Sequence, residues 1–226
     1  MKKGYTDITF ILDKSQSMGK VQMETIEGFN QFLKDQKEVE GEATFSLIMF
    51  DTSYNIIHNG INIQDVPDLN TDTYHPGNWT ALLDAVSRGI DEAGKRLDAM
   101  EEDEKPETVI FVIQTDGEEN SSKEASLEDV NKMITHQTEK YNWEFVFLGA
   151  NQDAFAAGSS LGISSAATIT YDHSSIGTRH VFAAASKGLS KRRMGDKVSG
   201  YFDKDDYDAQ NDLLKDKGLS NPDSQG

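Results

Sequence analysis

The most constraining feature of this sequence is an alternation between short apolar runs and longer stretches with helical periodicity. Five runs rich in β-branched and aromatic residues are typical of buried strands; they cover residues 8–12, 45–50, 109–113, 145–148 and 166–171. The runs are continuous rather than alternating, which indicates strands covered on both faces in a parallel sheet. Parallel strands need long crossover connections, and the segments between the runs are long enough to supply them.

Helices are predicted in these intervening segments. Apolar residues recur at helical spacing over residues 21–33 and again over 82–97. A third helix is expected to start near Ser126, where the sequence Ser-Leu-Glu-Asp resembles a capping box. Two further helices are expected over residues 153–159 and 178–192.

One segment departs from this alternation. Only Asp51-Thr52-Ser53 separates Phe50 from the next extended segment, which is too short for a helical crossover. We therefore predict a hairpin that makes the strand Tyr54–Ile57 antiparallel, at an edge of the sheet. The complete pattern predicts a Rossmann-like, doubly wound α/β domain with a mostly parallel sheet, one antiparallel edge strand and helices on both faces.

Composition divides the chain into a folded part and a tail. Residues 1–195 carry the alternating pattern and are expected to form one domain. From residue 196 onward Asp, Lys, Gly, Asn and Ser predominate and apolar residues are few. This composition predicts an acidic, flexible C-terminal tail over 196–226.

Charge and residue usage disfavour several classes of function. The formal net charge of −17 repels phosphate backbones, so direct binding to nucleic acid is not expected. The chain has no cysteine, which excludes disulfides and thiolate metal sites and suits a reducing compartment. We find no pattern typical of a signal peptide or of a membrane span, and therefore expect a cytoplasmic protein without a membrane partner.

Polar residues cluster where α/β sheets place their functional sites, outside the carboxyl ends of the strands. Asp13, Ser15 and Ser17 directly follow the first strand, Thr80 precedes the second long helix, and Asp116 follows the strand over 109–113. Two carboxylates and three hydroxyls are hard oxygen donors that suit Mg²⁺ or Mn²⁺ and, less specifically, Ca²⁺. Each residue could singly be a helix cap or a turn residue, but capping does not explain why all five are expected at one edge of the sheet.

The pattern Asp13-x-Ser15-x-Ser17, followed by Thr80 and Asp116, resembles the metal-ion-dependent adhesion site of von Willebrand factor A (vWA) domains. The resemblance covers nearly all of the folded segment and implies the vWA fold. It implies that the three hydroxyls bind the ion directly and that the two aspartates bind it directly or through water. It also implies that a Glu or Asp of a partner protein completes the coordination shell.

Two residues near this motif depart from the family pattern without removing a donor oxygen. Gln16 stands where the family often has glycine, and Trp79 stands where small residues are frequent. Trp79 can lie beside the ion as a large apolar contact for a partner, or it can pack over its loop as a lid. Asn78 and Glu118 are further candidate partner contacts, although Glu118 can equally hydrogen-bond to metal-bound water or be solvated.

Other titratable residues are expected to contribute less to the site. The five histidines show no metal-ligand spacing, and among them only His75 is expected near the metal. Asp51 follows its strand at the same edge of the sheet and is interpreted as a turn residue. Glu119 is expected to be solvated, with hydrogen bonding to metal-bound water as the alternative.

The leading prediction is a non-enzymatic protein-interaction module that binds an acidic residue of its partner through Mg²⁺. The resemblance further implies an adaptor in a multiprotein assembly, in some relatives beside an AAA+ ATPase. A Mg²⁺-dependent phosphate hydrolase is an alternative with Asp13 as nucleophile, but the haloacid-dehalogenase-like pattern needs a second acid where Ser15 stands. A nucleic-acid-associated vWA protein is another alternative, for which the basic segment Arg179–Arg193 is the available contact; its ordinary interpretation is a cationic helix end.

Overall fold

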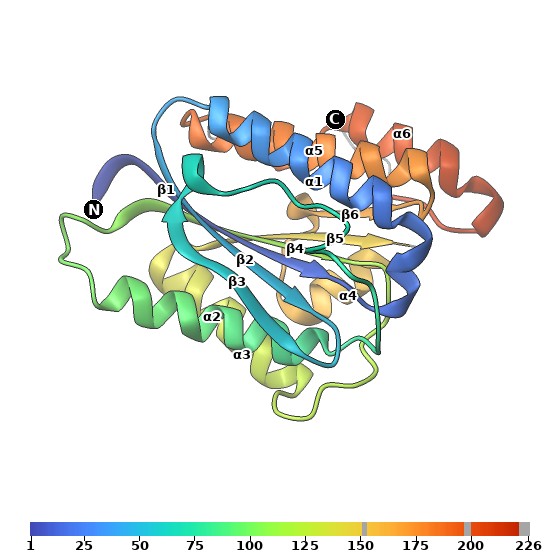
Figure 1. The fold of residues 1–226 in the computed structure, drawn as a ribbon, viewed down its shortest axis with the longest axis horizontal. Helices are drawn as coiled ribbons and strands as arrows, with labels where there is room; N and C mark the ends of the chain where they lie inside the picture. The colour runs from blue at the N-terminus through green and yellow to red at the C-terminus, as the bar shows by residue number, and fades with distance from the viewer. Residues whose placement is uncertain (151–152, 197–199, 222–226) are drawn as a thin grey trace.

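The computed structural model describes residues 1–150, 153–196 and 200–221. Within them one six-stranded sheet has the order β3-β2-β1-β4-β5-β6, and every neighbouring pair is parallel except β2 and β3 (Figure 1). The strands are β1 (Lys2–Asp13), β2 (Glu42–Phe50), β3 (Tyr54–Asn62), β4 (Pro106–Thr115), β5 (Glu144–Ala150) and β6 (Thr168–Tyr171). The predicted doubly wound sheet with an antiparallel edge strand is therefore confirmed.

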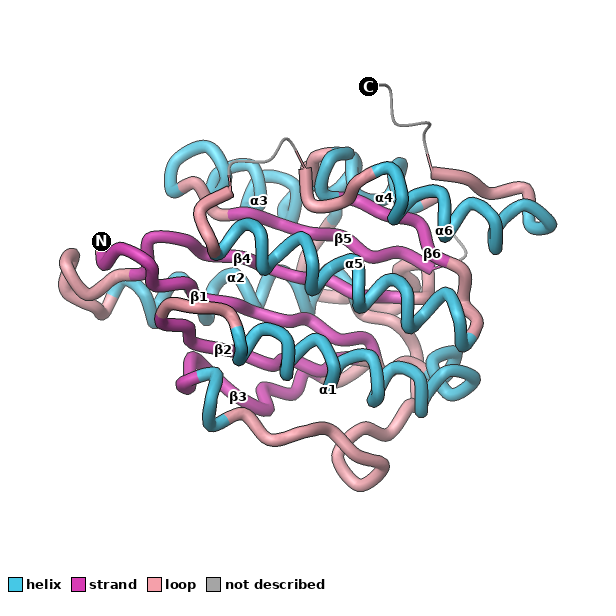
Figure 2. The backbone as a smooth tube through the Cα atoms, turned by 90° about the horizontal axis from the view of Figure 1, so that it is seen from above, coloured by secondary structure: helices cyan, strands magenta, loops and turns pink. Residues whose placement is uncertain are grey.

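Helices cover both faces of the sheet. They are α1 (Gln22–Glu38), α2 (Leu82–Asp98), α3 (Leu127–Tyr141), α4 (Ala154–Leu161), α5 (Ser175–Arg193) and α6 (Lys204–Leu214). Helices α1, α5 and α6 lie on one face, and α2, α3 and α4 lie on the other (Figures 1 and 2). Short 3₁₀ segments are η1 (Gln16–Val21), η2 (Ile63–Asp65), η3 (Ser165–Ala167) and η4 (Lys215–Lys217). No helix among the described residues is both long and apolar enough to cross a bilayer.

The central strands have continuous apolar sequences because they supply two separate cores. Phe10 of β1 and Val112 of β4 face the core beneath α1 and α5, whereas Ile11 and Phe111 face the core beneath α2 and α3. Successive side chains of a strand point to opposite faces, so a strand covered on both sides needs apolar residues at every position. Phe10 also packs edge-on against Phe29 of α1, with ring centroids 5.4 Å apart.

Local signals placed the start of α3 well, but they missed the first six residues of β1 and the second half of β3. The predicted capping box of α3 is confirmed: Ser126 Oγ accepts a hydrogen bond from the Asp129 N–H, and the Asp129 carboxylate accepts one from the Ser126 N–H. Strand β3 extends to Asn62, five residues beyond the predicted Ile57. Because β3 lies at an edge and much of it is exposed, its second half lacks the apolar signal of a buried strand.

The segment predicted as a flexible tail contains a packed helix, so that prediction was wrong for residues 200–221. Helix α6 starts with a capping box formed by Asp203 and Asp206. It buries Tyr207 in the core that α1 and α5 cover, and Leu214 is also buried. Few apolar residues are needed to attach so short a helix, so the polar composition of the segment gave no indication of it. Residues 197–199 and 222–226 of the predicted tail lie outside the described residues.

Buried amides complete the attachment of this segment. The Gln210 side chain accepts a hydrogen bond from the Asp172 N–H (3.0 Å) and donates one to the Gly177 carbonyl (2.9 Å). The Asn221 side chain accepts from the Thr170 N–H (2.7 Å) and donates to the Thr170 carbonyl (2.9 Å). Asn221 thus pairs with a backbone position of β6, at the edge of the sheet where such groups would otherwise lack a strand partner.

Candidate metal centre

Asp13, the last residue of β1, is fixed by hydrogen bonds to both carboxylate oxygens. Its Oδ1 accepts from the Ser15 N–H (2.6 Å), and its Oδ2 accepts from the Thr115 hydroxyl at the end of β4 (2.6 Å). The backbone carbonyl of Asp13 accepts a third bond from the buried Tyr74 hydroxyl (2.7 Å). Strand end, adjacent strand and the loop before α2 thus hold the carboxylate in one orientation.

Ser15 and Ser17 turn their hydroxyls toward Asp116, which follows β4. Ser17 Oγ donates to Asp116 Oδ1 at 2.8 Å, and Ser15 Oγ lies 3.4 Å from the same oxygen. The two serine hydroxyls are 3.2 Å apart. The hydroxyls of Ser15 and Ser17 therefore meet at one oxygen of Asp116, a carboxylate about a hundred residues later in the chain.

Thr80 reaches the same turn from the loop that precedes α2. Its backbone N–H donates to the Asn120 side chain (3.0 Å), and its carbonyl accepts from the N–H groups of Asn120 and Ser121 (3.1 and 3.2 Å). A Cβ added at Gly117 would lie only 2.9 Å from Thr80 Oγ1. Glycine after Asp116 therefore permits the threonine hydroxyl to approach this turn closely.

The electrostatics of the two carboxylates fit a bound cation. Burial and, less strongly, the charge of Asp116 together raise the pKa of Asp13 to about 6, although hydrogen bonds from Thr115 and Ser15 act in the opposite direction. Asp116 Oδ2 is buried and receives no hydrogen bond from the described residues. A divalent cation would offset this repulsion between the two carboxylates.

The hydroxyls are essential to this fit. Among the described residues, no group of three or more His, Cys, Asp or Glu side chains is placed to hold a metal ion. The donor set is instead two carboxylates and three hydroxyls, all hard oxygen ligands of the kind that Mg²⁺ accepts. Asp13, Ser15, Ser17, Thr80 and Asp116 are the residues that would hold the ion.

Hydrogen bonds centred on Asp51 hold the loop that precedes α2. Asp51 accepts hydrogen bonds from Lys14 Nζ (2.6 Å), Asn78 Nδ2 (2.8 Å) and the Ser53 N–H (2.6 Å), as expected of a turn residue. These bonds outweigh burial and lower the pKa of Asp51. Asn78 has a positive φ of 59°, and its carbonyl accepts from the Gln16 N–H (3.0 Å), so its amide and backbone both serve the loop.

Trp79 and Glu118, two of the residues predicted to contact a partner, are exposed, whereas Glu119 forms hydrogen bonds within the protein. Trp79 is 69% exposed, and Glu118 is also exposed. Glu119 accepts hydrogen bonds from the N–H groups of Leu83 (3.0 Å) and Ser122 (2.7 Å). It thereby satisfies a free N–H at the start of α2, a helix without a capping side chain. Because Glu119 lies 36 residues from Leu83 in the chain, no local sequence signal indicates this contact.

His173, which the sequence analysis did not single out, lies against the site. Its Nε2 is 3.1 Å from Asp116 Oδ2, and the two side chains are 6% and 0% exposed. Burial lowers the pKa of His173. The expected His75 is instead exposed, with Nε2 2.9 Å from the Asp72 carbonyl of its own loop. The usable signal was position: His173 follows the last strand, as the predicted ligands follow theirs.

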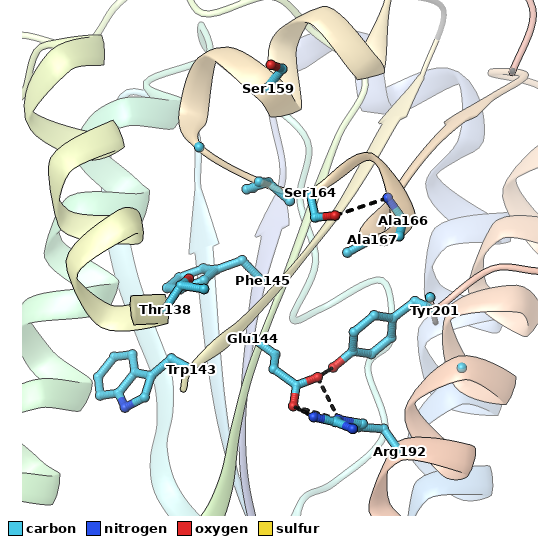
Figure 3. A pocket seen from close by; sticks show the side chains of 14 residues that line it. Thr138, Trp143, Glu144, Phe145, Ser159, Ser164, Ala166, Ala167, Arg192 and Tyr201 are labelled. Atoms are coloured by element: carbon cyan, nitrogen blue, oxygen red, sulfur yellow. Dashed lines mark hydrogen bonds and ion pairs between the residues drawn. The ribbon is translucent and has the colours of Figure 1, made fainter. Parts of the chain in front are cut away.

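The basic segment Arg179–Arg193 uses its charges within the fold, in agreement with its ordinary interpretation. Its contacts are Arg179 to Glu27, Lys187 to Asp203 and Asp206, Arg192 to Glu144, and Arg193 to the Gln36 carbonyl. The Glu144 carboxylate, at the start of β5, also accepts a hydrogen bond from the Tyr201 hydroxyl at 2.5 Å. Figure 3 shows Glu144, Arg192 and Tyr201 together beside a cavity of about 520 Å³. Glu144 begins β5, whereas the metal centre lies at the carboxyl ends of β1 and β4.

By sequence, no protein-family model and no curated protein matches this chain. Its structure is similar to that of proximal thread matrix protein 1 from the mussel byssus (17% identity, TM-score 0.58, 83% of this chain and 46% of that one). A second structure of that protein has a zinc-occupied adhesion-site motif (14% identity, TM-score 0.59, 81% and 47%). A von Willebrand factor type A protein from Catenulispora acidiphila is also similar (12% identity, TM-score 0.54, 84% and 43%). The chain spans less than half the length of each of these proteins, and the likeness concerns the fold: this chain has the vWA fold.

Proposed function

We propose that this chain is a protein-interaction module that depends on a divalent cation, with Mg²⁺ as the physiological ion. Asp13, Ser15, Ser17, Thr80 and Asp116 hold the cation, and a Glu or Asp of the partner completes its coordination. The observation that carries the proposal is the convergence of the two serine hydroxyls on Asp116 Oδ1, beside an Oδ2 atom to which no described residue donates a hydrogen bond. The zinc in the adhesion-site motif of proximal thread matrix protein 1 supports it.

The composition of the donor set favours an outside carboxylate as the last ligand. Both oxygens of Asp13 already accept hydrogen bonds from the protein, which reduces the negative charge that this residue offers the cation. The three hydroxyls are neutral. Mg²⁺ gives up its water reluctantly and usually relies on groups that its ligands bring, so an acidic side chain from a partner suits this site.

Trp79 is proposed as the apolar contact for the same partner. It is 69% exposed and directly precedes Thr80, and it borders a hollow of about 280 Å³ that Tyr54 and Arg88 also line. Tryptophan is enriched among residues that contribute most to protein interfaces. We expect the partner to carry an acidic residue for the cation close to an apolar side chain for this hollow, with exposed Glu118 at the margin.

A catalytic role is not part of the proposal. Phosphoryl transfer through Asp13 would benefit from a free cationic side chain near it, and the Lys14 amine is bound to Asp51 at 2.6 Å. Direct contact with nucleic acid is disfavoured, because the net charge is −17 and the Arg179–Arg193 segment pairs with acidic groups of the fold. A multiprotein assembly with an AAA+ ATPase stays a prediction.

The test is a pull-down from a lysate of the source cells, in Mg²⁺ and in EDTA. The baits are the wild type, the variant Asp13→Ala/Ser15→Ala, and the control variant Asp68→Ala/Ser159→Ala, which changes the same residue types at exposed positions away from the site. A protein retained in Mg²⁺ by the wild type and the control, and lost with EDTA or with the site variant, is the expected result. The same set of proteins from every bait in both buffers would refute cation-dependent binding.

A further inference from the structure

The carboxylate of Asp116 has polar neighbours at both of its oxygens. The hydroxyls of Ser15 and Ser17 lie 3.4 and 2.8 Å from Oδ1. At the other oxygen, His173 Nε2 lies 3.1 Å from Oδ2, and the His173 and Asp116 side chains are 6% and 0% exposed. The imidazole therefore contacts the side of the carboxylate that faces away from the two hydroxyls.

Contacts at both oxygens decide how this carboxylate is oriented. The torsion between Cβ and Cγ of an aspartate has broad minima, so a carboxylate that is held at one oxygen only can still turn. The serine hydroxyls hold Oδ1 of Asp116, and His173 is placed to hold Oδ2. Together they keep Oδ1 on the side where the proposed oxygen donors meet.

The turn that carries His173 is itself held by the C-terminal segment. The preceding residue, Asp172, is buried, its N–H donates to Gln210 of α6 (3.0 Å), and its carboxylate pairs with Lys217 at 2.5 Å. The start of α5 also approaches closely, because a Cβ at Gly177 would lie 2.0 Å from the Asp172 carbonyl oxygen. The imidazole thus has the defined position that a group needs in order to orient another side chain.

We propose that His173 is a positioning residue of the cation site, which holds the Asp116 carboxylate in the orientation that presents Oδ1 to Ser15, Ser17 and the ion. The inference rests on the proposed cation site and adds to it a residue that does not bind the ion itself. Removal of a group that orients a metal ligand typically costs roughly 10- to 100-fold in metal affinity. Such a group affects different cations alike, because it changes the geometry of a ligand and leaves the type of donor atom unchanged.

The experiment uses the full chain with His173→Leu, His173→Gln and His173→Asn, and His75→Gln as a matched control at an exposed histidine. Glutamine can place its amide nitrogen where Nε2 of the imidazole lies, whereas asparagine is too short to do so. Calorimetry gives the dissociation constants for Mg²⁺ and Mn²⁺, and urea unfolding in EDTA measures the stability of the cation-free fold.

We expect His173→Leu and His173→Asn to weaken Mg²⁺ and Mn²⁺ binding by roughly tenfold or more and to the same extent, whereas His173→Gln and His75→Gln stay within about threefold of the wild type. The comparison of the glutamine and asparagine variants separates positioning from a general effect on folding, because both replace the ring by an amide and differ in reach. Loss of stability in EDTA without loss of cation affinity would show a purely structural role and overturn the inference.

Other results would also contradict the inference. Wild-type affinity in His173→Leu and His173→Asn would show that Asp116 needs no contact from the ring. Equal weakening in all three His173 variants would show that the shape of the ring matters and its nitrogen does not. Failure of the wild type to bind either cation would overturn the proposed function itself, which separates that case from a failure of the inference alone.

Discussion

Replacing Asp13 by asparagine should make the protein more stable in EDTA and unresponsive to Mg²⁺. Burial and the charge of Asp116 raise the pKa of the Asp13 carboxyl from 3.8 to about 6. Such a group binds its proton more tightly in the folded than in the unfolded chain, so stability falls as the pH rises from about 4 to about 6. At pH 7.5 the whole penalty applies, and asparagine, which has no charge, removes it.

The change in folding stability expected for Asp13→Asn follows from the pKa shift of Asp13. A rise in pKa from 3.8 to about 6 corresponds to about 3 kcal/mol of folding free energy. Asparagine accepts at one oxygen only, so one of the bonds from the Ser15 N–H and the Thr115 hydroxyl is weakened, at a cost of about 1 kcal/mol. We therefore expect a net gain of about 2 kcal/mol for Asp13→Asn at pH 7.5 in EDTA, which disappears toward pH 4.

Urea unfolding followed by circular dichroism measures this difference at both pH values. Mg²⁺ at ten times its dissociation constant should add about 1.4 kcal/mol to the wild type and nothing to Asp13→Asn. Asp51→Asn is the matched control with the opposite sign, because hydrogen bonds from Lys14, Ser53 and Asn78 lower the pKa of Asp51 and the charged form is the stabilised one. An Asp13→Asn variant less stable than the wild type at pH 7.5 in EDTA would refute the reasoning.

Three further predictions concern the attachment of the C-terminal segment and the partner surface. Gly188→Ala should lower the free energy of unfolding by about 2 kcal/mol, because its Cβ would lie 2.3 Å from a backbone carbonyl of the segment before α6. The control variant Gly94→Ala, whose Cβ would have no atom within 4 Å, should raise the free energy of unfolding by about 0.5 kcal/mol. Equal melting temperatures for the two variants would contradict this packing. Trp79→Ala should weaken partner binding by tenfold or more in surface plasmon resonance without lowering the melting temperature, since the ring is 69% exposed; unchanged affinity would remove Trp79 from the interface. Hydrogen bonds outweigh burial and lower the pKa of Asp203 to about 2. The contribution of this carboxylate to folding stability is therefore complete above pH 4 and is lost as the pH falls toward 2. Asp203→Asn should flatten the acid limb of a stability–pH profile, and an unchanged limb would exclude this contribution.

Local patterns in the sequence were sufficient to predict the sheet and the position of the proposed oxygen donors at one edge of it. Continuous apolar runs indicated strands buried on both faces, and the three residues after Phe50 were too few for anything but a hairpin. The donors could be found because each follows a strand or precedes a helix, and parallel strands bring those ends to one edge. Apolar runs, short loops and polar residues at strand ends depend only on residues close together in the chain, so they can be identified from the sequence.

Tertiary structure alone decided the attachment of the C-terminal segment and the surroundings of Asp116. Gln210 and Asn221 fasten a polar segment to β6 through buried amide hydrogen bonds, which composition cannot distinguish from solvated amides. His173 reaches Asp116 across the sheet from β6, and no spacing in the chain relates the two residues. The physical reason is common to both: burial and distance between groups far apart in sequence determine whether a polar side chain is solvated, structural or a ligand.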